Sequence, residues 1–173
     1  MHISTSGLIL FNCLLFLFFS GDTSASTVDG SEIIGEYAPN FEYFDFKREI
    51  HRLYDLKGTV CVVAFWQPED ENCERALKAL ESIHNSYKDA GVKVVAINIR
   101  GRTTDVLLYL AQQDMNYLFL EGILSDALNA WKIEGVPSVF IIDKEMRVKD
   151  YIPGIDEGYE RRISTVIDLL LKQ

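Results

Sequence analysis

The stretch Val60–Trp66 decides the fold, because its residues read VCVVAFW and include no charged or turn-forming side chain. A continuous β-branched and aromatic run of this length is typical of a strand that is buried on both faces. We therefore predict that it forms the central strand of a sheet.

The residues that follow predict a long helix and then a second strand. Apolar residues recur at helical spacing over 77–87, and Asp70 precedes them as a candidate N-cap. A helix over 71–90 is expected to end at Gly91, before the strand pattern of 92–99. A strand, a helix and a strand in this order imply parallel pairing and a right-handed crossover.

The remainder of the chain predicts two further helices, a short strand, a β-hairpin and a closing helix. A helix is expected over 104–114, and a shorter one, capped by Ser125, over 125–132. The other expected elements are a brief strand at 117–120, hairpin strands at 138–143 and 148–152, and a helix through Ile163 and Leu170. The order indicates an α/β fold, with a mixed central β-sheet flanked by helices and an N-terminal extension.

The first 25 residues predict an export signal that is absent from the mature protein. Leu8–Phe19 is apolar and uncharged, but it has about half the length that a membrane-spanning helix needs. Thr23 and Ala25 supply the small-x-small pattern of a cleavage site, so we expect cleavage after Ala25. The protein is then periplasmic or secreted, and membrane-anchored only if the leader is not cleaved. Residues 26–34 are expected to be a flexible lead-in to a single domain over 35–173.

The charge of the chain argues against a nucleic-acid partner. The formal net charge is −9, and removing the leader with Asp22 leaves 17 basic and 25 acidic residues. Binding to phosphates requires a basic surface instead. The sequence contains no glycine-rich phosphate loop, and His51 and His84 stand apart from any metal-ligand spacing, so we expect neither a cofactor nor a metal.

The expected mature chain keeps two cysteines, Cys61 and Cys73. Cys61 opens the predicted central strand and Cys73 lies beyond its far end, about 16 Å away at ~3.3 Å per residue. Bridged cysteines have Cα atoms within about 7 Å, so we expect no disulfide between them. Cys61 is expected to lie in the core.

Six short segments occur in an order that resembles the thioredoxin superfamily. They are GEYAPNF at 35–41, LKG at 56–58, Phe65-Trp66, GVPS at 135–138, FIIDK at 140–144 and Gly154. The resemblance covers about 35–171 and is closest to the exported TlpA- and ResA-like, redoxin-type proteins. It implies a thioredoxin-like fold and, as partner, a protein or an extended peptide.

The sequence differs from the family pattern at the redox motif. Such proteins carry Cys-x-x-Cys between the central strand and the first helix, where the first thiolate attacks a disulfide and the second resolves the intermediate. Residues 70–73 of this chain read Asp-Glu-Asn-Cys, so Asp70 stands in the attacking position and Cys73 in the resolving one. A carboxylate cannot form a mixed disulfide, so dithiol activity is not expected.

Cys73 is the remaining candidate catalytic residue. The N-terminus of a helix lowers the pKa of a thiol, whereas the neighbouring acids Glu69, Asp70, Glu71 and Glu74 raise it. We expect a slow thiol. Cys73 is then either a small packed side chain or a lone reactive group, and Asp70 is in the first place a helix cap.

The resemblance also assigns a peptide-binding face. Pro137 corresponds to the proline that thioredoxins hold in the cis form beside the active site, and the backbone of Val136 would bind an extended peptide. Trp66 lies beside the same site and is a candidate for lining the groove, although core packing also accounts for Trp66 and Trp131. Met146 replaces the glycine usual in the hairpin turn, so a strained turn is expected there.

Related oxidoreductases often place an acid after the second parallel strand, where this chain has Arg100 and Arg102. These arginines either offset the acidic cluster or face solvent. Three functions are therefore open: a non-catalytic peptide- or protein-binding module of the cell envelope, a thiol-disulfide oxidoreductase acting through Cys73, and a one-cysteine peroxidase. The peroxidase reading is disfavoured because an ionised Asp70 cannot donate to peroxide as the usual threonine does.

Overall fold

The structure is a computed structural model that describes residues 29–173, and the predicted leader and cleavage site lie outside this part. Five strands form one mixed sheet in the order β5-β4-β3-β6-β7. The central strand β3 (Cys61–Trp66) is parallel to β4 (Lys93–Asn98) and antiparallel to β6 (Ser138–Ile142). β5 (Leu118–Glu121) and β7 (Val148–Pro153) form the edges. The predicted mixed sheet, with VCVVAFW at its centre, is confirmed.

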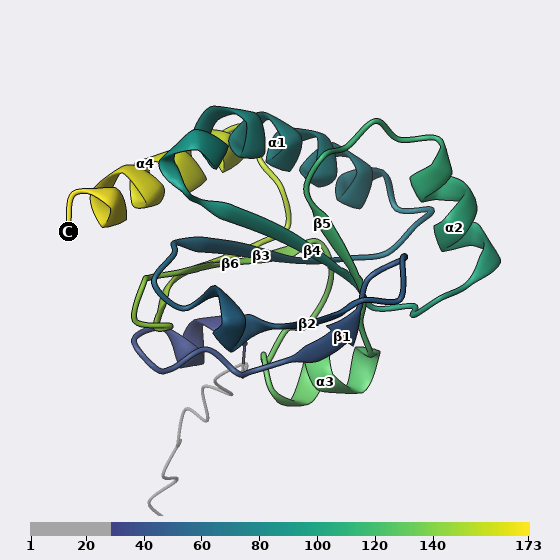
Figure 1. Ribbon diagram of the computed structural model, residues 1–173, viewed down its shortest axis with the longest axis horizontal. Helices are drawn as coiled ribbons and strands as arrows, with labels where there is room; N and C mark the ends of the chain where they lie inside the picture. The colour runs from purple at the N-terminus through teal and green to yellow at the C-terminus, as the bar shows by residue number, and fades with distance from the viewer. Residues whose placement is uncertain (1–28) are drawn as a thin grey trace, which may run out of the picture.

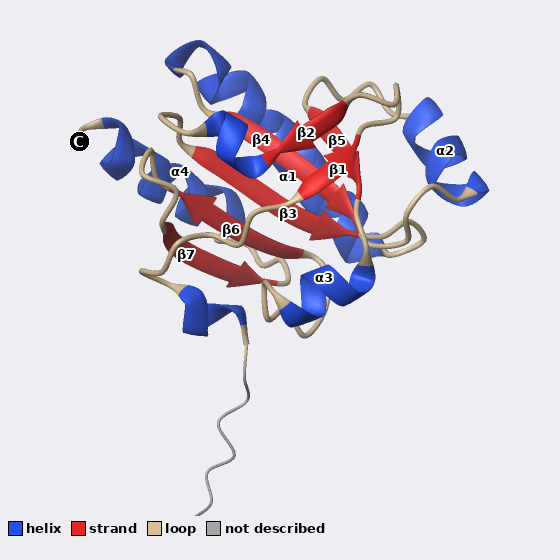
Figure 2. Ribbon diagram, turned by 60° about the horizontal axis from the view of Figure 1, so that its bottom comes forward, coloured by secondary structure: helices blue, strands red, loops and turns tan. Residues whose placement is uncertain are grey.

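Helices and a small hairpin cover the two faces of this sheet (Figures 1 and 2). The helices α1 (Glu71–Tyr87) and α4 (Tyr159–Leu171) pack on one face. The other face carries α3 (Leu124–Asn129) and the antiparallel pair β1 (Glu42–Phe44) and β2 (Ile50–Arg52). The helix α2 (Thr104–Ala111) lies beyond the end of β4 (Figure 1).

The alternation of strand side chains explains the two cores. All six residues of β3 are buried. Val62, Ala64 and Trp66 belong to the core under α1 and α4, whereas Cys61, Val63 and Phe65 belong to the core on the opposite face. Each fully buried aliphatic or aromatic side chain of this kind stabilises the fold by about 1.5–3 kcal/mol relative to exposure. A charged residue at Val63 would therefore be expected to prevent folding.

Four helix boundaries differ from the sequence prediction, one of them the end of α3 (Leu124–Asn129), which was expected at 132. The first helix leaves α-geometry after Tyr87 and continues as a 3-10 turn, η3 (Lys88–Ala90), which ends at Gly91 with φ of +84°. α2 ends at Ala111 rather than at 114. α3 begins at Leu124, and the predicted cap Ser125 lies inside it, where its hydroxyl faces the Asp126 carboxylate.

The part of the predicted lead-in that the structure describes contains a short 3-10 turn, and its flexibility stays a prediction. The Asp29 side chain caps a 3-10 turn, η1 (Gly30–Ile33). Gly30 packs so closely on β7 that an added Cβ would lie 2.6 Å from the Tyr151 ring.

A second 3-10 turn, η2 (Leu53–Leu56), connects β2 to the segment before β3. Within residues 29–173, no helix combines the length and apolar character needed to cross a bilayer.

The turn between β6 and β7 contains the expected strain. Met146 has φ of +70°, a conformation that a residue with a Cβ rarely adopts. Its side chain is fully buried in the core beneath α3. The Asp143 carboxylate holds the turn by accepting hydrogen bonds from the backbone N–H groups of Glu145 and Arg147. The burial of the methionine side chain and the hydrogen bonds to the Asp143 carboxylate offset the backbone strain.

Candidate functional site

The predicted site residues lie together at the edge of the sheet where several strands end, not along an outer strand. The carboxyl ends of β3, β4 and β5 meet there, and so does the amino end of β6, because β6 runs antiparallel to β3. The segment before α1 carries Asp70 and Cys73, and the segment before β6 carries Val136 and Pro137. The predicted tetrad and the predicted peptide face therefore lie at the same edge.

Asp70 is the N-cap of α1. Its backbone is extended, and its Oδ1 atom accepts a hydrogen bond of 2.9 Å from the backbone N–H of Cys73. The carboxylate satisfies one of the donors that a helix leaves unpaired at its first turn. Glu69, just before it, has φ of +61°, so the connection turns sharply before the helix starts. The expected capping role is confirmed.

Cys73 is completely buried behind this cap. Burial, together with the charges of Asp70 and Glu74, raises the pKa of the Cys73 thiol to about 12, although a hydrogen bond from the Gln67 backbone opposes the shift. The thiol is therefore neutral at physiological pH. Both Cys61 and Cys73 are free and buried, as expected from their separation.

Aromatic side chains close the space around Cys73. Trp66 is 1 % exposed and packs against the rings of Tyr109 and Phe119, with centroid distances of 5.3 and 5.9 Å. Trp131 is equally buried, against Phe65 and Phe140 on the other face. The candidate role of Trp66 in a peptide groove is therefore corrected: its ring fills the core, and no surface is left for a peptide to touch.

The half-buried Val136 and the buried Pro137 lie at the same edge, in the segment before β6. The peptide bond between them is cis. The carbonyl of Pro137 accepts a hydrogen bond from Gly154 N–H at 2.7 Å, and the hydroxyl of Ser138 donates to the Gly135 carbonyl. Within the described residues, no backbone hydrogen bond uses the N–H or the C=O of Val136. A cavity of about 240 Å³ lies beside these residues and is also lined by Tyr151.

The arginines after β4 pair with acids outside the tetrad. Arg100 lies 3.6 Å from Asp105 of α2, and Arg102 forms an ion pair with Glu121 at the end of β5. Glu121 also pairs with Arg48 of the β1–β2 turn, at 3.3 Å. The buried Asn98 shapes this loop, since its side chain accepts from Arg100 N–H and donates to the Gly101 carbonyl. The arginines thus hold neighbouring segments together, a role the sequence did not single out.

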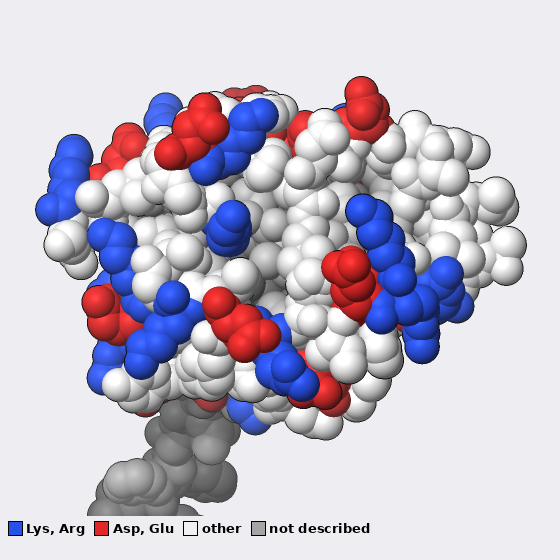
Figure 3. All heavy atoms as spheres, viewed as in Figure 1, with Lys and Arg blue, Asp and Glu red and all other residues white. Residues whose placement is uncertain are grey.

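An uncharged surface borders the site, and sequence reasoning missed it. Figure 3 shows charged side chains of both signs over the β1–β2 side, whereas the surface over α2 is largely free of them. Leu108 of α2 is 59 % exposed, and Ile123 and Leu124, which follow β5, are 55 % and 47 % exposed. Leu108 and the Ile123–Leu124 pair belong to helices that pack against different cores, so they are two separate apolar spots.

The sheet order, the helix that starts at the tetrad and the cis proline before β6 define a thioredoxin-like protein. The chain belongs to the AhpC/TSA family, whose model matches residues 34–151. Among characterised proteins it is similar to the thiol-disulfide oxidoreductase ResA of Geobacillus kaustophilus, with 28 % identity over 135 residues, 77 % of this chain and 78 % of the relative. It also resembles ResA of Bacillus subtilis, with 26 % identity over 79 % of this chain and 72 % of the relative.

Solved structures share the fold. A protein of Chlorobium tepidum assigned as the thiol:disulfide interchange protein DsbE superposes with a TM-score of 0.74 at 23 % identity, over 80 % of this chain and 97 % of that one. The thioredoxin domain of a thiol-disulfide oxidoreductase from Bacteroides vulgatus gives a TM-score of 0.67 at 21 % identity, over 79 % and 97 %. At these identities the likeness concerns the fold alone.

Proposed function

We propose that the chain is an exported thioredoxin-like module that binds an extended peptide or a partner protein and does not exchange disulfides through a dithiol pair. The observation that carries this proposal is the state of the tetrad. Its first residue, Asp70, is engaged as a helix cap, and its last, Cys73, is a fully buried thiol. Neither residue is able to start a disulfide exchange in this state.

The chemistry of exchange explains why both features matter. The attacking group must be a thiolate that reaches the disulfide of a partner. Asp70 supplies an oxygen that cannot form a sulfur–sulfur bond. Because burial raises the pKa of the Cys73 thiol to about 12, the thiol is almost entirely neutral at pH 7. Cys73 also has no exposed surface through which a partner sulfur would approach.

The binding half of the proposal rests on the backbone of the half-buried Val136, beside the cis bond to Pro137. An extended peptide is held by backbone hydrogen bonds to an unpaired segment, with apolar contacts on either side. The N–H and C=O of Val136 are available for this purpose within the described structure, and Ile123 and Leu124 offer apolar surface at the same edge of the sheet. We infer that the partner is an unfolded or extended segment of a protein.

A second candidate function is thiol chemistry at Cys73. It is favoured by the names of the relatives, which are thiol-disulfide oxidoreductases. It requires the first turn of α1 to unfold locally so that the sulfur becomes exposed. The hydrogen bond from the Cys73 backbone N–H to Asp70 opposes this local unfolding. Binding without exchange is therefore the function that the site supports best.

The binding proposal is tested with a fluorescein-labelled, carboxymethylated insulin B chain as the extended probe. Fluorescence anisotropy is measured for the purified protein, for Val136→Lys and for Leu169→Lys. Leu169 of α4, which is 56 % exposed, controls for the added charge, and circular dichroism verifies that Val136→Lys is folded, because Val136 is half-buried. We expect saturable binding that Val136→Lys weakens by about tenfold or more, a loss of at least 1.4 kcal/mol, and that Leu169→Lys leaves unchanged. Equal binding by both variants would contradict the proposed face.

Export is a separate part of the proposal. The leader lies outside the described residues, and its composition is the support for cleavage after Ala25. N-terminal sequencing of the protein recovered from the envelope or medium of an expressing bacterium is expected to begin at Ser26. A chain that begins at Met1 or stays in the cytosol would contradict export with cleavage.

A further inference from the structure

Three metal-ligating side chains converge on the β1–β2 hairpin, away from the tetrad. In the register of the hairpin, Tyr43 lies opposite His51 and Phe44 lies opposite Ile50, so that Asp45 and Glu49 follow as the next pair. Because side chains alternate along a strand, Asp45 and His51 share the face that Tyr43 buries against the domain. Sequence reasoning treated His51 as isolated, since strands of three residues give no recognisable pattern.

The ligand atoms lie at distances typical of a metal site. One atom each from Asp45, Glu49 and His51 fall within 4.8 Å of one another, and His51 Nε2 lies 3.1 Å from Asp45 Oδ2. Two ligands of a tetrahedral ion, each at ~2.0–2.1 Å from it, are about 3.3 Å apart. The His51–Asp45 separation is already close to that value, and only small side-chain rotations are needed to bring in Glu49.

The Asp45 carboxylate is held in place for this role. Its Oδ1 atom accepts hydrogen bonds of 2.8 Å from the backbone N–H groups of Lys47 and Glu49. This fixes the orientation of the group and directs Oδ2 toward His51. Ligands that are fixed by additional hydrogen bonds in this way lose little freedom when they bind a metal.

Apart from His51, no positively charged side chain pairs with the two carboxylates of the cluster within residues 29–173. Asp45 and Glu49 bring two negative charges, and within residues 29–173 neither of them forms an ion pair with a lysine or an arginine. The arginines of the hairpin are engaged elsewhere, Arg48 with Glu121 and Arg52 with Glu42. A divalent cation would supply the missing positive charge.

We propose that Asp45, Glu49 and His51 form a binding site for a divalent transition metal ion of the zinc type. One imidazole and two carboxylates match the ligand preferences of Zn²⁺ and of its neighbours Co²⁺ and Ni²⁺. Asp45 is buried, His51 is half-buried and Glu49 is exposed, so the ion would enter from the solvent side and keep a fourth position for water.

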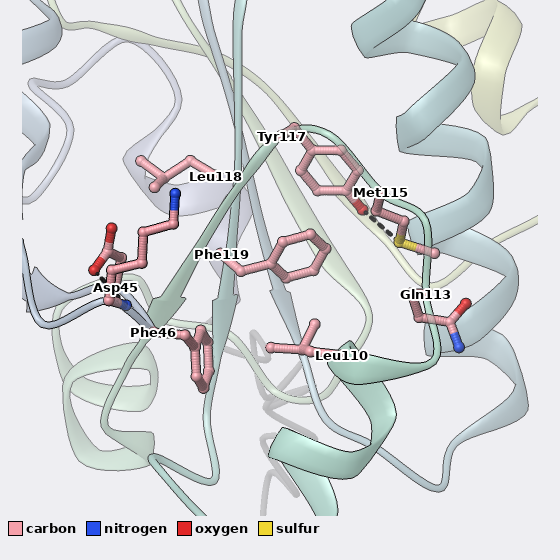
Figure 4. Close-up of a pocket in the computed structure, with 9 residues that line it drawn as sticks. Asp45, Phe46, Leu110, Gln113, Met115, Tyr117, Leu118 and Phe119 are labelled. Atoms are coloured by element: carbon pink, nitrogen blue, oxygen red, sulfur yellow. Dashed lines mark hydrogen bonds between the residues drawn. The ribbon is translucent and has the colours of Figure 1, made fainter.

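The position of the site gives the ion a structural effect. Asp45 forms a β-bridge with Leu120 of β5, so a bound ion would tie the two strands of the hairpin to each other and to the edge of the main sheet. Asp45 also borders a cavity of about 390 Å³, into which Phe46, Leu110 and Phe119 point (Figure 4). The ion is therefore expected to stabilise the hairpin wall of this cavity and to stabilise the folded state by mass action.

The test measures metal binding directly. The purified protein is treated with EDTA, dialysed and titrated with Zn²⁺ by calorimetry, and then with Co²⁺ while the visible absorption of the bound ion is followed. The variants His51→Gln and Glu49→Gln each remove one ligand and keep the size and polarity of the side chain. Glu42→Gln is the matched control, because it removes one carboxylate from the same hairpin outside the cluster.

We expect saturable Zn²⁺ binding that each ligand variant weakens by about tenfold or more and that Glu42→Gln leaves within about twofold, with a parallel loss of the Co²⁺ absorption. Zn²⁺ should also raise the melting temperature of the protein and of Glu42→Gln, but not of the ligand variants. Absence of saturable binding, or equal affinity in all four proteins, would overturn the proposal and leave His51 and Asp45 as an ordinary ion pair. Circular dichroism of each variant verifies that it is folded.

Discussion

The Oδ1 atom of Asp70 accepts a hydrogen bond from the backbone N–H of Cys73 at 2.9 Å, so the first and last residues of the tetrad are joined by a helix cap and not by a disulfide. This contact satisfies a backbone N–H group in the first turn of α1, and the Cys73 side chain is buried in the core. The same segment of chain therefore both caps the helix and encloses the Cys73 thiol.

The cap predicts a specific stability effect. Asp70→Ala removes the acceptor and is expected to lower the free energy of unfolding by about 1 kcal/mol. Asp70→Asn keeps a hydrogen-bond acceptor at the same place, so it should lower the free energy of unfolding much less, although it also removes the negative charge. Urea unfolding of the three proteins measures the difference. Equal losses in both variants would indicate that the charge of Asp70, rather than its hydrogen bond, stabilises the helix.

The raised pKa of Cys73 predicts slow labelling and a loss of stability at high pH. Burial raises the pKa of the folded thiol to about 12. An unfolded thiol ionises near 8.5, so the stability that Cys73 contributes is complete below about pH 8.5 and is lost as the pH rises toward 12. Maleimide labelling at pH 7, read by peptide mass spectrometry, should be slow at Cys73 in the folded protein and fast in urea.

The control for this prediction is Cys73→Ala. This variant lacks the ionisable group, so the part of the pH dependence that comes from Cys73 should disappear from its unfolding curves between pH 8.5 and 11. Rapid labelling of Cys73 in the folded protein at pH 7 would favour the second candidate function, in which the thiol reacts.

Met146 and Arg48 both have positive φ angles, but glycine substitutions at the two positions should change the free energy of unfolding by different amounts. Both backbones are in the left-handed region, at +70° and +71°. Met146→Gly relieves strain of about 1 kcal/mol but removes a fully buried side chain, which costs about 2–5 kcal/mol. It should therefore destabilise the protein. Arg48→Gly relieves the same strain and gives up an ion pair with Glu121 and a contact with the Phe44 ring, both made by a side chain that is 58 % exposed, so it should change the free energy of unfolding by less than about 1 kcal/mol. Urea unfolding of both variants is the measurement, and a stabilised Met146→Gly would contradict the packing argument.

The central strand and first helix were predictable because their patterns are local. Burial on both faces leaves an uninterrupted apolar run in β3, and one buried face leaves helical spacing in α1. Asp70 was identifiable as a cap because its type and its place before an amphipathic helix are sufficient. The strain at Met146 was predictable because a methionine occupied a turn position that favours glycine.

Other features depend on contacts between segments that are distant in the sequence. Trp66 was a candidate for the groove because an aromatic side chain suits a binding surface as well as a core, and its burial follows from packing with Tyr109 of α2 and Phe119 of β5. The pairing of Arg102 and Glu121 arises when β4 and β5 lie side by side. Asp45, Glu49 and His51 are close in the sequence, but they share one face only because two very short strands pair, and strands of three residues leave no pattern in the sequence.

The most direct test of the central claim is dithiothreitol-dependent reduction of insulin by three proteins. The natural chain should give no turnover above the uncatalysed background, because residue 70 supplies no attacking thiol. Asp70→Cys should form a disulfide with Cys73 under mild oxidant, seen as a loss of two mass units, and should gain insulin reductase activity. Glu71→Cys, which adds a cysteine at the wrong spacing, should do neither. Turnover by the natural chain comparable to that of Asp70→Cys would contradict the account.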